Sequence, residues 1–255
     1  MKIIVLAKQV PDTEANIRIN SNGTNIETSG IKFVLNPYDE YAMEEALRIK
    51  QANPEAEITA ITMGGATSQE VLRNCLALGA TKAVRVKTET ESTDSYSTAL
   101  ILSKAIEKLG YDIILTGKQA VDDGAMFVPG AISSLLNIPF VSSAIKIDIS
   151  DKNCSVRREI EGNTEVIECS LPAIISAEKG LNQPRYASLM GIMQAKKKPI
   201  EELTITDLGI SQDETRTRTS KLEYPPQRKQ GEILEGEAGE VVTKLVEKLK
   251  EAKVL

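Results

Sequence analysis

The sequence predicts an α/β fold with a doubly wound, mostly parallel sheet, an antiparallel extension and an extended C-terminal arm. Three observations favour this class: apolar runs alternate with helical patterns, one region alternates apolar and polar residues, and one long polar stretch shows neither period. The apolar runs lack polar alternation, which is typical of strands buried on both faces of a sheet. They occupy residues 2–7, 56–64, 82–87, 111–117 and 172–177.

The first helix is predicted from the residues at its start. Asn36 is expected to be the N-cap, and Pro37 then takes the first helical position, which proline favours. Asp39 falls in the first turn, where the helix dipole stabilises an acid. The segment therefore predicts a helix directly after a short strand end.

Two further helices are predicted from their end signals. Thr67 and Glu70 have the spacing of a capping box, and Gly79 marks the end of that helix. A third apolar stripe ends at Gly110. Because strands and helices of this length alternate, the sequence predicts βαβ units.

Two later segments break the alternation. Residues 145–170 alternate apolar and polar positions around turn signals at 151–153 and 162–163, so we expect antiparallel strands. Residues 207–236 are polar and show no period, and such a long irregular stretch is rare inside a compact domain. An amphipathic helix is predicted after it, over 237–252.

The predicted domain organisation follows from these segments. Residues 1–206 are expected to form an α/β domain, and residues 207–255 an arm with an end helix that docks on another subunit. A solvated flexible tail is the alternative for the arm.

Composition excludes several classes of function. The chain of 255 residues has a formal net charge of −5, which gives no general reason to expect nucleic acid as a partner. It contains no histidine, so Ser-His-Asp catalysis, Cys-His catalysis and histidine metal sites are absent. No catalytic residue or metal site is expected.

The cysteines and the N-terminal segment bear on location. Cys75, Cys154 and Cys169 are widely spaced and form no CxxC pair, so reduced, buried structural thiols are expected. The apolar run before Lys8 is too short for a signal peptide or a membrane span. We therefore expect a cytoplasmic protein without membrane insertion.

A ligand site is predicted beyond the carboxyl ends of the parallel strands, where open α/β sheets bind ligands. The candidate positions are Leu6–Lys8, Met63–Gly65, Gly117–Gln119 and the helix start at Asn36–Asp39. Neither GxGxxG after the first strand nor GxxxxGK[ST] occurs, so the common dinucleotide and P-loop fingerprints are missing.

Of these candidate positions, the loop over residues 116–130 offers the most groups that could bind a ligand. It supplies glycines, a lysine and backbone N–H groups ahead of a predicted helix. A purely structural turn is the alternative. Asp122 and Asp123 are a possible metal pair, but without further converging acids a helix N-cap is the favoured interpretation.

Three motifs carry a family resemblance. The segments "NPYDEYAMEEALRIK", "TGKQAVDD" and "LNQPRYASLMGIMQAKKKPIEE" resemble the β subunit of electron-transferring flavoproteins, and the similarity spans essentially the whole chain. The resemblance implies a fold like that of adenine-nucleotide α-hydrolases and a heterodimer whose α subunit binds FAD. It also implies an adenine nucleotide at Leu6, Asn36, Pro37, Tyr38, Asp39, Met63, Gly117, Lys118, Gln119, Ala120, Val121, Asp122, Asp123, Gly124, Ala125, Met126, Phe127 and Val128.

The same resemblance implies a partner-binding loop over 181–198. Leu189 would be an apolar anchor for a flavin dehydrogenase, of the acyl-CoA type or another. Lys196, Lys197 and Lys198 would steer that partner electrostatically. A core leucine beside a solvated lysine face is the alternative.

The resemblance leaves two nucleotides possible in this subunit, AMP and FAD. Family members that hold AMP tend to have polar residues after Asp123, whereas this chain has "GAMFVPG". We therefore expect FAD here, reduced by NADH in an electron-bifurcating type. A simple carrier with AMP, an ATP-using enzyme of the α-hydrolase fold and a nucleotide-sensing module are the alternatives.

Overall fold

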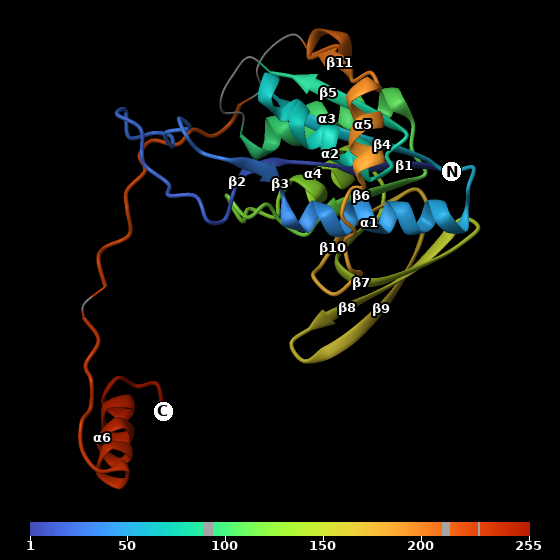
Figure 1. Cartoon of the computed structure of the whole chain (residues 1–255). Coiled ribbons are helices and arrows are strands. Elements are labelled where there is room, and N and C mark those ends of the chain that lie inside the picture. The colour runs from blue at the N-terminus through green and yellow to red at the C-terminus, as the bar shows by residue number, and fades with distance from the viewer. Residues whose placement is uncertain (89–93, 211–214, 229) are drawn as a thin grey trace.

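The predicted strands form one large sheet in the computed structural model, which describes residues 1–88, 94–210, 215–228 and 230–255 (Figure 1). Its strands are β1 Lys2–Leu6, β4 Glu57–Gly64, β5 Lys82–Lys87, β6 Ile113–Gly117, β7 Phe140–Ser150, β8 Asn153–Ile160, β9 Asn163–Ser170, β10 Ala173–Ala177 and β11 Glu201–Thr204. Their order is β11-β5-β4-β1-β6-β10-β7-β8-β9. A separate antiparallel pair joins β2 Gln9–Pro11 to β3 Phe33–Leu35.

The sheet is parallel from β11 to β7 and antiparallel from β7 to β9, as expected. The helical segments are α1 Pro37–Ala52, η1 Ala66–Ser68, α2 Gln69–Leu78, α3 Ser95–Leu109, α4 Val128–Leu136, α5 Leu189–Lys197, η2 Thr206–Leu208 and α6 Ala238–Glu251. The chain builds outward from β1 through β4 to β5, then returns to place β6 on the other side of β1. The topological switch point of the fold therefore lies between β1 and β6.

Two core clusters cover the two faces of the sheet, which confirms the doubly wound fold. In β1, Ile3 and Val5 pack into the cluster that contains α1 and α2, whereas Ile4 and Leu6 pack into the cluster that contains α3 and α4. Successive side chains of a strand point to opposite faces, so both faces of β1 must be apolar. This explains why the run showed no polar alternation.

The helix starts differ in detail from the predictions. Asn36 is the N-cap residue of α1 by position, but its side chain makes no capping hydrogen bond. The predicted capping box is wrong, because Ser68 is the N-cap of α2 and the chain reaches it through the 3-10 turn η1. Thr67 instead donates its hydroxyl to the Gln9 side chain. The ends at Gly79 and Gly110 are confirmed.

The C-terminal arm leaves the α/β unit after η2. Leu208 is buried against the second core cluster, so packing of the unit extends slightly past residue 206. The described residues between η2 and α6 form no helix or strand, and residues 211–214 and 229 of the predicted arm lie outside the described residues. The arm passes the 12–32 segment, where Leu222 N–H donates to the Gly23 carbonyl, and α6 projects away from the sheet (Figure 1).

Candidate functional site

The predicted ligand positions meet at the switch point of the sheet. Leu6 ends β1 and Gly117 ends β6, and these strands are neighbours in register. Met63 lies near the end of β4, on the other side of β1. The Leu6 side chain is buried in the core, whereas Met63 is half-buried. Ligands of open α/β sheets bind in the crevice outside such strand ends.

Asp39 joins three segments at this point. Its Oδ2 accepts from the Lys8 N–H at 2.8 Å, and its Oδ1 accepts from the Gly117 N–H at 2.9 Å and from Asn36 Nδ2 at 3.0 Å. Burial raises the pKa of Asp39 to about 7, and these hydrogen bonds oppose the rise. The carboxyl group therefore ties the end of β1 and the end of β6 to the start of α1.

Asn36 orders the loop that follows β6. Its Oδ1 accepts from the Val121 N–H at 3.1 Å, and its Nδ2 also donates to the Gln119 carbonyl at 2.9 Å. This explains why the side chain is not used as a helix cap. Asn36 is buried, so these bonds satisfy polar atoms that water does not reach.

Gly117 permits the close approach of β6 to α1. A Cβ atom at Gly117 would lie 2.4 Å from Asp39 Oδ1 and 2.7 Å from Tyr38 Cβ. Neither neighbour is a flexible chain end, because Asp39 is held by its hydrogen bonds. The glycine is therefore required for this junction rather than for turn flexibility.

Asp122 and Asp123 bind Lys8, a candidate position at the end of the first predicted strand that the family resemblance did not assign to the nucleotide. Lys8 Nζ lies 2.8 Å from Asp122 Oδ1 and 3.0 Å from Asp123 Oδ2. Burial lowers the pKa of Lys8, but the two carboxylates outweigh it and raise the pKa. The signal for Lys8 was its place directly after a buried strand, opposite the acidic loop.

The predicted N-cap role of Asp122 and Asp123 is wrong, because α4 begins five residues later at Val128 with Phe127 as its N-cap. Within the described residues, no group of three or more potential metal-ligating side chains occurs. The pair instead closes the loop: Asp122 accepts from the Asp123 N–H, and Asp123 accepts from the Ala125 N–H.

The second half of the loop is open. Gly124 has φ +59°, and no heavy atom lies within 4 Å of the position that a Cβ atom would take there. Met126 and Phe127 are exposed. Many loop N–H groups donate to protein acceptors, as those of Lys118, Val121 and Gly124 do. In the described structure the N–H groups of residues 126–128, at the start of α4, have no protein acceptor.

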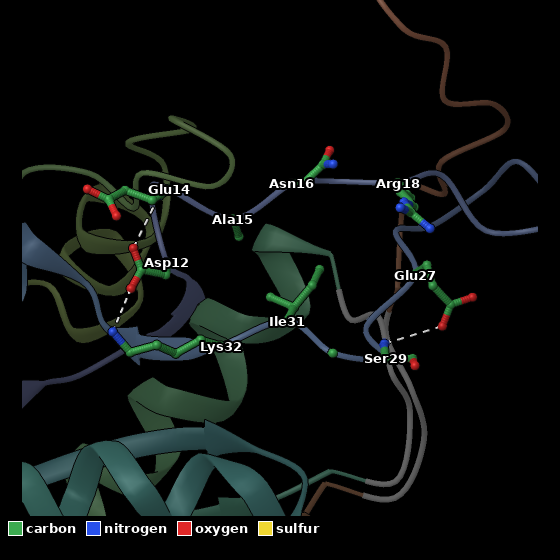
Figure 2. A pocket seen from close by; sticks show the side chains of 10 residues that line it. Asp12, Glu14, Ala15, Asn16, Arg18, Glu27, Ser29, Ile31 and Lys32 are labelled. Atoms are coloured by element: carbon green, nitrogen blue, oxygen red, sulfur yellow. Dashed lines mark hydrogen bonds and ion pairs between the residues drawn. The ribbon is translucent and has the colours of Figure 1, made fainter.

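A separate hollow lies along the segment that joins β2 to β3. This cavity has a volume of about 610 Å³. Figure 2 shows the side chains that line it, with the Asp12–Lys32 ion pair at one side. It is lined by Asp12, Glu14, Ala15, Asn16, Arg18, Glu27, Ser29, Gly30, Ile31 and Lys32. None of the strand-end residues lines it, so it is separate from the site at the switch point.

Of the predicted partner residues, Leu189, Lys196 and Lys197 lie on α5, and Lys198 is its C-cap residue. None of them belongs to the strand-end network, which consists of Asn36, Asp39 and Gly117. Leu189 is 83% exposed, so the core-leucine alternative is wrong. Lys196 and Lys197 are exposed, whereas Lys198 is half-buried and donates from Nζ to the Ala80 carbonyl at 2.9 Å. The three lysines are therefore not equivalent.

Comparison with known proteins identifies the family. Residues 24–208 match the model of the electron transfer flavoprotein domain. The chain is 38% identical over 260 residues to the electron transfer flavoprotein subunit beta of Bacillus subtilis (strain 168), with 100% of both chains covered. It is 36% identical over 259 residues to the Homo sapiens subunit beta, covering 98% of this chain and 97% of the human one.

The chain belongs to the electron transfer flavoprotein β-subunit family. The resemblance read from the three sequence motifs is thereby confirmed, together with the α/β fold. Family membership implies an electron transfer flavoprotein function, which neither the ATP-using enzyme nor the nucleotide-sensing module predicts. None of the helices in the described ranges has the length and apolar character needed to cross a membrane.

Proposed function

We propose that this chain is the β subunit of a heterodimeric electron transfer flavoprotein and holds an adenine nucleotide at the ends of β1, β4 and β6. The observation that carries the proposal is the network of Asp39, Asn36 and Gly117 at the switch point. This network holds the loop after β6 in place, and the loop leads to unpaired N–H groups at the start of α4. Such groups favour phosphate.

We further propose that the nucleotide is FAD. A diphosphate needs room and donors, and the open side of Gly124 adjoins the loop that leads to the start of α4. Met126 and Phe127 expose apolar surface there, which suits a flavin ring and has no counterpart in AMP. Bound FAD supplies redox chemistry with NADH, whereas the residues of this chain bind its phosphates and orient it. AMP in a simple carrier is the alternative.

We propose that two different helices, α5 and α6, bind two different protein partners. We propose that the arm and α6 bind the α subunit, because α6 has no buried residue and presents an apolar face that the α/β unit does not cover. Leu189 on α5 is proposed to dock a flavin dehydrogenase, with Lys196 and Lys197 at the rim of that contact. A cytoplasmic location is part of the proposal and is tested by cell fractionation.

Counting nucleotides in the purified heterodimer tests the nucleotide proposal. Two FAD per heterodimer, with flavin reduced by NADH, support the bifurcating type. One FAD and one AMP, without reaction with NADH, would establish the simple carrier. No adenine nucleotide in this chain would overturn the site itself.

A matched pair of variants at Gly124 tests the location of the diphosphate. Its φ of +59° is left-handed, which Asn and Asp tolerate alike, and the space beside it is open. Gly124→Asp and Gly124→Asn therefore differ mainly in charge. We expect Gly124→Asp to weaken retention of the nucleotide in this chain by about tenfold or more, roughly 1.4 kcal/mol, while Gly124→Asn retains it. Equal retention by both variants would contradict a phosphate at this position.

A further inference from the structure

Two cysteines on consecutive strands, 15 residues apart, lie opposite each other on the antiparallel extension. Cys154 in β8 and Cys169 in β9 are direct partners in the strand register. Their Sγ atoms are 3.1 Å apart, and both thiols are free. Neither residue takes part in the strand-end network or lies on α5, so the proposed function does not use them.

The surroundings make the two thiols unequal. Cys154 is 2% exposed and packs with Val156 in the first core cluster, whereas Cys169 is partly exposed. A surface cavity of about 470 Å³ is lined by both cysteines together with Asp148, Ile149, Ser150, Asn153, Ser155, Glu168 and Ser170. A small polar reagent can therefore reach Cys169 from solvent, with Cys154 directly behind it.

We propose that Cys154 and Cys169 form a dithiol site that a low-molecular-weight disulfide oxidises reversibly to an intramolecular disulfide. Opposite residues of antiparallel strands have Cβ atoms about 4.5–5.5 Å apart, and a disulfide needs about 3.5–4.5 Å. Closure therefore requires only a small approach of β8 and β9. This site lies beyond the family function and is independent of the nucleotide proposal.

The reaction balances as two thiol–disulfide exchanges. The Cys169 thiolate attacks one sulfur of the reagent, forming a mixed disulfide and releasing one reagent thiolate. The Cys154 sulfur then attacks Cys169 Sγ, forms the intramolecular bond and releases the second thiolate. The two protons of the cysteines pass to the two released thiolates, so both protein thiols are oxidised and the reagent disulfide is reduced to two thiols.

The order of the two steps follows from exposure. Burial raises the pKa of Cys154 to about 12, so this thiol is a weak nucleophile toward reagents in solution. Once Cys169 carries the mixed disulfide, however, Cys154 is in contact with the sulfur it must attack. The second step is then intramolecular and needs no encounter with a reagent.

Oxidised glutathione tests the proposal on the full-length protein, purified with the subunit and nucleotide it carries. We expect the native protein to lose two hydrogen atoms by intact mass, to retain no glutathionyl group and to yield a peptide crosslink between Cys154 and Cys169. A thiol reductant should restore the original mass. Cys75 is fully buried in the core and is the internal control, because it should stay reduced.

Two variants resolve the order of the steps. Cys154→Ala should keep one glutathionyl group on Cys169, whereas Cys169→Ala should react at least about tenfold more slowly, since only buried thiols remain. Peptide mapping of the unmodified protein needs no variant, so a misfolded variant leaves the test intact. A stable glutathionyl adduct on the native protein, a crosslink that involves Cys75, or no reaction would overturn the proposal.

Discussion

Helices α5 and α6 both expose apolar side chains, but the chain supports them very differently. In α5, Ser188 accepts from the Gly191 N–H as a helix cap, and Ala195 is buried. Arg73 in α2 donates to the carbonyls of Ala195 and Lys198 at the far end of α5. In α6, by contrast, no residue is buried and no side chain caps the start.

Helix α5 packs closely against α2. A Cβ atom at Gly191 would lie 2.4 Å from the Ala77 carbonyl oxygen, so the glycine lets α5 lie directly on α2. The segment before it is held as well: Arg185 forms two hydrogen bonds with Glu44, at 2.7 and 2.8 Å, and Asn182 donates to Glu45. A bidentate pair of this kind fixes orientation. Leu189 is therefore presented on a preformed support.

Exposed apolar residues therefore occur in two different settings in this molecule, on a helix that packs against the α/β unit and on a helix that does not. On α5 the supporting helix is complete without a partner, which is what a transient docking site needs. On α6 no residue is buried, and the described contact with the arm is an exposed ion pair between Lys248 and Glu232. Short isolated helices are marginal in water, so the apolar face of α6 is the means by which a partner can stabilise it. We therefore infer that α6 needs a permanent partner and α5 a temporary one.

The largest expected effect comes from removing the arm. Truncation after Gly209 should abolish pairing with the α subunit, because it deletes the whole apolar face of α6. The α/β core should stay folded, since Leu208 is the last buried member of the two core clusters and only the partly buried Ile210 at their edge is lost. Size-exclusion chromatography of the co-expressed subunits measures pairing, and circular dichroism measures folding.

A shorter truncation sharpens this result. Ending the chain after Gly236 removes α6 but keeps the arm, including the Tyr224 hydroxyl that accepts from the Ile19 N–H. We expect pairing to be lost here too if the helix is the essential contact. If the chain that ends at Gly236 still co-eluted stoichiometrically with the α subunit, α6 would not be the essential contact with this partner.

The second prediction concerns Leu189. Leu189→Ala should weaken binding to the dehydrogenase by roughly 10- to 150-fold, because burying a leucine contributes about 1.5–3 kcal/mol. The melting temperature and flavin content should hardly change, since the side chain is 83% exposed in the free subunit. Titration of electron transfer rate against dehydrogenase concentration measures the effect.

Two controls bracket that variant. Val166→Ala removes another exposed apolar side chain, on β9, and should leave electron transfer unchanged. Leu72→Ala removes a fully buried leucine in α2 and should lower the stability by about 2–5 kcal/mol. A melting-temperature loss for Leu189→Ala close to that of Leu72→Ala would place Leu189 in a structural role.

Sequence patterns predicted the parallel strands, the antiparallel extension and most helix ends, because these depend on local periodicity and on glycine stops. They failed where a polar side chain had a choice of partners. Asn36 and Thr67 carry the residue types of N-caps, yet their hydrogen bonds go to the 119–121 loop and to Gln9. Those partners are distant in sequence, so no local pattern contains them.

The strand-end site was predicted by position but not by contact. The rule that ligands bind beyond parallel strand ends located Asn36–Asp39 and Gly117, and all of them meet at the switch point. The contact of Cys154 with Cys169 depends on the register of the β8–β9 hairpin, which the predicted turn at 162–163 did not fix. The pairing of Lys8 with Asp122 depends on β1 and β6 being neighbours in the sheet. Strand order is not written in the spacing of residues along the chain.

The third prediction tests how much the hydrogen bonds of Asp39 in the strand-end network contribute to the stability of the free subunit. Asp39→Asn should destabilise the protein by about 1–3 kcal/mol, because the new amide would face the N–H of either Lys8 or Gly117 and leave a buried donor unpaired. Glu55→Gln, an exposed acid beyond α1, is the matched control. Chemical denaturation of the nucleotide-free protein measures the difference.

The pH dependence of that difference has a defined sign. Asp39 has its pKa raised from 3.8 to about 7 in the folded state, so the folded protein binds this proton more tightly than the unfolded chain does. Its contribution to stability is complete below pH 3.8 and is lost as the pH rises to about 7. The advantage of the native protein over Asp39→Asn should therefore shrink, by up to about 1.4 kcal/mol per pH unit, between pH 5 and 7. A growing advantage over this range would contradict the assignment.

The smallest expected effect separates the lysines at the end of α5. Lys196 and Lys197 are exposed, so Lys196→Gln and Lys197→Gln together should lower the association rate with an acidic dehydrogenase surface by roughly two- to tenfold at low salt. The loss should disappear near physiological ionic strength, where screening acts within about 8 Å. Stopped-flow measurements at several salt concentrations test this.

Lys198 should behave differently, because its Nζ is bound to the Ala80 carbonyl and its own carbonyl accepts from Arg73. Lys198→Gln should loosen the seating of α5 and so raise the dissociation rate, with little change in the salt dependence of association. If all three lysine substitutions changed only the association rate, the last turn of α5 would be a uniform charged surface. The hydrogen bonds of Lys198 would then contribute little to holding α5 against α2. Helix α5 would in that case differ less from α6 in how it is held by the rest of the chain.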